Sequence, residues 1–160
     1  MARPYPYFPA WDGKKASPVL VWFVKACNRR WGFTNLGIYV NRPVRNPAAK
    51  GALSTHATGF ACDIGYPSTK AGRKTAVEAY NWLLEHSESL RISAVHDYRY
   101  GQFGRAYRSS RGAGKTGERI YQNAKESAGR GGNWLHVEIE NTWSDAKEFE
   151  AAWRALPKPE

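Results

Sequence analysis

The stretch STHATGFACDIG, residues 54–65, places His56 and Asp63 seven positions apart around Gly59. In one straight strand this odd separation would point the two side chains to opposite faces. Gly59 supplies a turn, after which Asp63 lies on one face of a strand and the other face is apolar, with Phe60, Cys62 and Ile64. We therefore expect a strand that is backed by the core and presents Asp63 to a polar cleft.

A second stretch, NWLHVEIEN at residues 133–141, presents another histidine in the same way. Its alternation directs Leu135, Val137 and Ile139 into the core and leaves Trp134, His136 and Glu138 on the opposite face. Two imidazoles and a carboxylate on adjacent strands form a three-ligand site with a fourth position open to water, as in catalytic zinc sites. The candidate ligands are His56, Asp63 and His136, although a lone histidine on a strand is more often a hydrogen-bonded structural residue.

The remaining patterns predict an α+β fold with a largely antiparallel sheet and flanking helices. Helices are expected over residues 17–32, 68–89 and 144–156, and a further strand over 91–101. Residues 101–132 are rich in Gly, Arg and Ser without periodicity, which predicts a long functional or mobile loop. The length fits one domain over residues 1–160, with the motif-bearing core at about 17–156.

Composition limits the partners and the compartment. The chain of 160 residues carries a formal net charge of +10, which favours a polyanionic partner such as nucleic acid, an anionic cell wall or an anionic membrane. Cys27 and Cys62 form no metal-binding pair and are expected to be buried free thiols. The N-terminus has no apolar core of signal-peptide length, and no run of 18 apolar residues occurs, so we expect a cytoplasmic start and no stable membrane insertion.

The pattern SxHxxGxAxD, formed by Ser54, His56, Gly59, Ala61 and Asp63, resembles the zinc motif of the D-Ala-D-Ala carboxypeptidase and L-alanyl-D-glutamate endopeptidase family, which shares its fold with the Hedgehog signalling domain. WLHVEI resembles that family's last zinc-ligand strand, and YVNRPVRN resembles the arginine-bearing segment of phage-type members, so the resemblance covers roughly residues 35–140. It implies zinc held by His56, Asp63 and His136.

The same resemblance implies where substrate would bind. Arg42 or Arg45 would meet substrate carboxylate or carbonyl groups, because the planar guanidinium suits bidentate binding. Ser54 of the motif and Trp134 on the His136 face are the other candidate substrate-binding residues.

One position departs from the family pattern. The acidic general base usually lies three residues before the last histidine, where this chain has Asn133. An amide cannot take the proton, and loss of a general base costs on the order of 10²- to 10⁴-fold in rate. The candidates to replace this general base are Glu138, Asp97 and His96.

Two functions follow from these patterns. The first is a zinc-dependent peptidoglycan peptidase of the phage endolysin type, a monomeric hydrolase that waits in the host cytoplasm and cuts stem-peptide bonds next to D-amino acids. The alternative is a catalytically impaired, zinc-containing module of the same fold that binds peptidoglycan, which Asn133 favours. The positive charge suits the wall and its anionic polymers.

Two other functions are disfavoured. SSRGAGKTGE, residues 109–118, lacks the first glycine of a phosphate-binding loop, whose place is taken by Ser109. Nucleic-acid binding would depend only on the charge and on the Arg and Tyr residues of 98–115.

Overall fold

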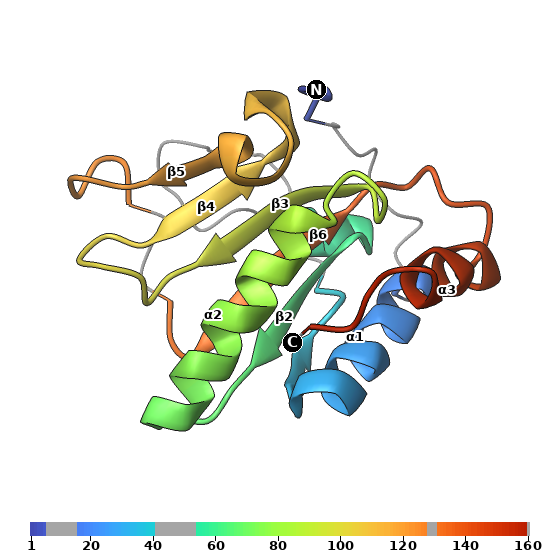
Figure 1. Cartoon of the computed structure of the whole chain (residues 1–160), viewed down its shortest axis with the longest axis horizontal. Helices are drawn as coiled ribbons and strands as arrows, with labels where there is room; N and C mark the ends of the chain where they lie inside the picture. The colour runs from blue at the N-terminus through green and yellow to red at the C-terminus, as the bar shows by residue number, and fades with distance from the viewer. Residues whose placement is uncertain (6–15, 41–53, 128–130, 160) are drawn as a thin grey trace.

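A computed structural model describes residues 1–5, 16–40, 54–127 and 131–159. Within them lies a six-stranded sheet of order β1-β2-β6-β3-β4-β5 in which every neighbouring pair is antiparallel (Figure 1). The strands are β1 (Thr34–Gly37), β2 (Ala61–Gly65), β3 (Ile92–Asp97), β4 (Arg105–Arg108), β5 (Glu118–Ile120) and β6 (Trp134–Ile139). The predicted α+β class with an antiparallel sheet is confirmed.

The helices begin and end where the local sequence provides caps. They are α1 (Pro18–Trp31), α2 (Lys70–Glu85) and α3 (Ala146–Arg154), all three inside the predicted ranges. Pro18 opens α1 and Gly32 closes it in the left-handed conformation at φ 73°. The side chains of Thr69 and Asp145 accept hydrogen bonds from backbone N–H groups in the first turns of α2 and α3.

The core lies between the sheet and the helices, with α1 packed on β2 and α2 on β3 (Figure 1). As predicted, the core side of the two ligand-bearing strands consists of Cys62, Ile64, Leu135, Val137 and Ile139. α3 packs on α1 through edge-to-face aromatic contacts, such as Trp22 with Phe149 at 5.7 Å between ring centroids and Phe23 with Trp153 at 5.8 Å. The opposite face of the sheet carries Asp63, His136 and His96 as cross-strand neighbours.

The prediction of one long loop over residues 101–132 is wrong. The segment contains β4 and β5, joined through the short 3-10 helices η3 (Ser109–Arg111) and η4 (Gly114–Gly117). Both strands are short and polar, so they lack the apolar alternation by which strands are recognised. Gly117 is required by close packing, because a Cβ atom there would lie 2.5 Å from both the Tyr107 ring and the Gly112 carbonyl oxygen.

Two further expectations concern thiols and membranes. Cys27 and Cys62 are free and buried, as predicted. No helix in the described part of the chain is both long enough and apolar enough to cross a membrane.

Candidate metal centre

His56 lies in the short 3-10 helix η2 (Thr55–Thr58), immediately before β2. The hydroxyl of Ser54 accepts a hydrogen bond from the His56 backbone N–H at 3.3 Å and caps this turn. Gly59 ends the turn in the left-handed conformation, at φ 76°, and directs the chain into β2. The predicted turn at Gly59 is therefore confirmed, and it returns the His56 ring over the strand that carries Asp63.

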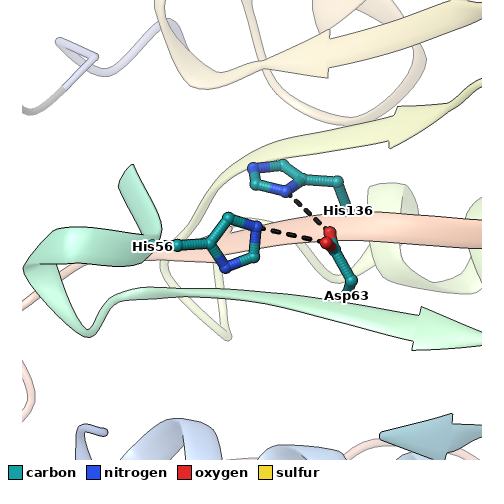
Figure 2. A group of neighbouring side chains, drawn as sticks. All are labelled: His56, Asp63 and His136. Atoms are coloured by element: carbon teal, nitrogen blue, oxygen red, sulfur yellow. Dashed lines mark hydrogen bonds and ion pairs between the residues drawn. The ribbon is translucent and has the colours of Figure 1, made fainter. Parts of the chain in front are cut away.

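Asp63 and His136 are direct partners across β2 and β6. Nδ1 of His136 lies 3.0 Å from Oδ1 of Asp63, and Nε2 of His56 lies 3.3 Å from Oδ2 of the same carboxylate (Figure 2). One candidate ligand atom from each residue falls within 4.8 Å of the others, so this group could hold a metal ion. The structure thus brings together the three residues that the sequence predicted as ligands.

The second ring nitrogen of each histidine also has a partner. Nδ1 of His56 lies 3.3 Å from the Ile38 carbonyl oxygen, and Nε2 of His136 lies 3.0 Å from Oε1 of Glu138. Histidines that bind a metal almost always donate their other N–H to a carboxylate or carbonyl, which fixes the tautomer and the ring orientation. The donor set and its supports therefore fit a divalent cation with two nitrogen ligands and one oxygen ligand.

The ionisable groups of this cluster shift one another's pKa values. Burial alone would raise the pKa of Asp63, but hydrogen bonds with His136 and His56 hold it well below its usual range. Burial would likewise lower the pKa of His136, whereas its bonds to Asp63 and Glu138 raise it to about 9. At neutral pH, the metal-free protein therefore holds an imidazolium between two carboxylates. A bound cation would take the place of the extra proton on His136 and supply the positive charge between the two carboxylates.

Glu138 was predicted as a replacement general base, and the structure shows both of its oxygens engaged. Oε1 contacts His136, Oε2 accepts a hydrogen bond from the Tyr5 hydroxyl, and the residue is only 4% exposed. Burial would raise the pKa of Glu138, but the contacts with His136 lower it to about 2. In this geometry each oxygen of Glu138 has a partner, and the carboxylate supports the ring of a candidate ligand.

Asp97, a candidate replacement for the general base, does not lie on the ligand face of the sheet. Asp97 is paired with Leu135 across β3 and β6, so its side chain lies on the helix-covered face, opposite His136. Arg73 binds its two oxygens at 2.8 and 2.9 Å, and Nε of Arg105 binds one of them at 3.0 Å. This fully buried carboxylate pairs with two guanidinium groups, and Arg105 is also paired with Glu118 at 3.5 Å, so Asp97 cannot reach the candidate metal ligands.

The other predicted residues have varied positions. Ser54 is buried and its hydroxyl caps η2, so its observed contact orients His56. Trp134 lies two residues before His136 on the same strand face and contacts Tyr98 edge-on at 5.8 Å.

Asn133 precedes β6, and its carbonyl oxygen accepts a hydrogen bond from the Tyr66 N–H at 2.9 Å. Arg42 and Arg45 lie outside the described residues.

His96 lies directly beside His136 across β3 and β6, with 5.3 Å between ring centroids. Its Nδ1 is buried and has no hydrogen-bond partner in the part of the chain that the structure describes. Burial and the neighbouring His136 lower the pKa of His96 to about 3, which keeps its ring neutral at physiological pH. A neutral imidazole is thus available on the ligand face, as a weak base.

Tyr5 is the residue near this centre that sequence reasoning missed. It is separated from Glu138 by 133 positions, and no periodic pattern includes it. Only the pairing of the N-terminal segment with the sheet could reveal the contact.

Comparisons of this chain with protein-family models, with curated proteins and with solved structures gave no significant match.

Proposed function

We propose that this protein is a zinc-dependent peptidase that cleaves peptide bonds next to D-amino acids in peptidoglycan. The observation that carries the proposal is the convergence of His56, Asp63 and His136 within 4.8 Å, because these are the residues of the motif that resembles the D-Ala-D-Ala carboxypeptidase and L-alanyl-D-glutamate endopeptidase family. The antiparallel sheet flanked by helices is compatible with the Hedgehog-type fold that the resemblance implies.

The three ligands would hold zinc through Nε2 of His56, a carboxylate oxygen of Asp63 and Nδ1 of His136. When bound, zinc lowers the pKa of a coordinated water and polarises the scissile carbonyl. Around this position, Glu138 and the Ile38 carbonyl oxygen keep the two rings in the ligating orientation. Trp134 lies on the same strand face as His136 and would flank the substrate, and Arg42 or Arg45 would meet its carboxylate groups.

A second candidate function is peptidoglycan binding without efficient hydrolysis. It is favoured by Asn133 at the position of the family's acidic base, and by the arrangement of the carboxylates. Within the described residues, Glu138 is bound on both oxygens and Asp97 lies on the far face of the sheet. Slow hydrolysis would then depend on the ligated cation, with His96 as the neutral base nearest to His136.

The proposed setting is a phage endolysin that reaches the bacterial wall after the membrane is permeabilised. A net charge of +10 supports association with an anionic wall and its polymers. A monomer with no nucleic-acid partner remains part of this proposal.

The deciding experiment digests purified peptidoglycan with the protein, with and without a chelator, and identifies released fragments by mass spectrometry. Chelator-sensitive release of stem peptides or dipeptides supports the peptidase, and His56→Ala should abolish it. Co-sedimentation with peptidoglycan without any released fragment would instead support the binding module. If the protein neither binds zinc nor associates with peptidoglycan, both proposals are wrong.

A further inference from the structure

We propose that Tyr5 is a positioning residue of the metal centre and acts on His136 through Glu138. The inference rests on the proposed zinc site, and it assigns to the N-terminal segment, residues 1–5, a part in metal binding.

Arg3 fixes the N-terminal segment to the sheet. Its backbone N–H donates to the Ser109 carbonyl oxygen at 2.9 Å, and its guanidinium donates to the Ile92 carbonyl oxygen at 2.6 Å and to the Glu140 carboxylate at 3.1 Å. These partners follow β4, begin β3 and follow β6, so one residue ties the segment to three strands. Tyr5 is thereby held at a defined place two residues further on.

Tyr5 reaches a position on the ligand face of the sheet. Glu138, Ala94 and Arg108 are neighbours across β6, β3 and β4. The small side chain of Ala94 leaves room between the two longer ones, and the Arg108 guanidinium lies 5.0 Å from the centroid of the Tyr5 ring. The Tyr5 hydroxyl donates its hydrogen bond to Oε2 of Glu138.

The result is a continuous hydrogen-bonded chain from Tyr5 to a metal ligand. Tyr5 holds one oxygen of Glu138, the other oxygen holds Nε2 of His136, and Nδ1 of His136 faces the other two ligands. A carboxylate bound at both oxygens cannot rotate without breaking a hydrogen bond, so the His136 ring keeps the orientation in which Nδ1 faces Asp63 and the proposed metal position. Removal of the Tyr5 hydroxyl frees one oxygen and loosens that support.

The test compares Tyr5→Phe with Tyr107→Phe, which makes the same chemical change. Tyr107 is fully buried on the helix-covered face, and its hydroxyl has no hydrogen-bond partner among the described residues. Zinc affinity is measured without substrate, by competition with a chelating dye. Tyr5→Phe should bind zinc roughly 3- to 10-fold more weakly than wild type, less than the 10- to 100-fold typical of losing a direct partner of a ligand. Tyr107→Phe should match wild type.

A double-mutant cycle separates positioning from a general effect on folding. In a Glu138→Ala background, Tyr5→Phe should cause little further loss of zinc affinity, because the proposed effect of Tyr5 on His136 passes through that carboxylate. If Glu138→Ala does not fold, Glu138→Leu, which also removes both oxygens, takes its place in the cycle. Equal losses in both backgrounds would show that Tyr5 acts independently of Glu138 and would overturn the proposal.

The remaining outcomes distinguish this inference from the proposed function. If wild type binds zinc and Tyr5→Phe binds it equally well, the positioning role is wrong and the zinc site stands. If wild type binds no zinc, the proposed function fails and the positioning role fails with it.

Discussion

Asp63 and His136 face each other as direct partners in the antiparallel pairing of β2 and β6, with 3.0 Å between Oδ1 and Nδ1. Two of the three candidate ligands are therefore fixed by backbone hydrogen bonds between neighbouring strands. His56 is added from the capped turn that precedes β2. A site built on rigid elements requires little rearrangement to bind a cation.

Each chain should bind one zinc ion, and His56→Ala should lose it. Zinc binds the native state, so a chelator should lower the melting temperature of wild type and leave that of His56→Ala unchanged. Elemental analysis and thermal unfolding measure both effects. His86→Ala is the control, because His86 packs edge-on to Trp82 at the end of α2, away from the centre. Less than about a tenth of an equivalent of zinc after supplementation would contradict the metal site.

Asn133→Asp should raise hydrolysis by about 10²-fold or more at unchanged zinc content, because it restores a carboxylate at the family's general-base position. Initial rates of fragment release from peptidoglycan measure the gain. Asn141→Asp makes the same change at an exposed turn beyond the other end of β6 and should have no effect. If the gain is absent, another residue already serves as the base. If only the variant releases peptide, the natural chain is a binding module.

Glu138→Gln should weaken zinc binding by roughly 10- to 100-fold, because an amide supports the His136 ring less well than a carboxylate. Any loss of turnover should follow the loss of zinc and recover as the zinc concentration is raised. Titration of activity against zinc measures this dependence. Activity that stays lost at saturating zinc would instead identify Glu138 as the general base.

The metal-free protein should lose stability as the pH rises from 6.5 towards 9.5. The folded pKa of His136 is raised to about 9 from an ordinary value of 6.5, so its contribution is fully present below pH 6.5 and is lost as pH passes 9. The loss should be on the order of 3 kcal/mol. Urea unfolding in the presence of a chelator measures it. His136→Gln should lack this slope, and an identical slope in that variant would assign the effect to other groups.

Asp97→Asn should destabilise the fold without changing zinc affinity. Asp97 is fully buried, and it is bound by Arg73 and by Arg105, whose side chain is only 4% exposed. Removing one partner of a buried ion pair costs about 3–5 kcal/mol, because charge is left uncompensated. Denaturant unfolding measures the cost. Glu150→Gln is the control, since the exposed Glu150–Arg154 pair should contribute at most about 1 kcal/mol. Weakened zinc binding in a folded Asp97→Asn would contradict its placement.

The thiols of Cys27 and Cys62 should be unreactive in the native protein. Both are fully buried, and burial raises the pKa of each thiol well above its ordinary value. The reactive thiolate is therefore scarce and shielded. Alkylation with iodoacetamide, followed by mass spectrometry, should modify neither residue until the chain is unfolded. Rapid modification of native protein would contradict their burial.

Local sequence patterns predicted the ligand strands and the helices. Alternation in WLHVEI placed His136 and Glu138 on the face opposite Leu135 and Val137, and Gly59 indicated the turn between His56 and Asp63. These features depend on the periods of strands and helices and on the conformations that Gly and Pro favour. Short stretches of sequence are enough to determine them, whatever the rest of the fold.

Only the tertiary structure decided which strands lie side by side, and therefore which side chains become neighbours on a face. The strand order places β6 between β2 and β3, and thereby aligns Asp63, His136 and His96 in one row. Docking of the N-terminal segment brings Tyr5 to Glu138. These contacts join positions far apart in the chain, and their choice depends on packing of the whole sheet. Local periodicity determines the face to which each side chain points, but it does not determine which residue lies beside it on the next strand.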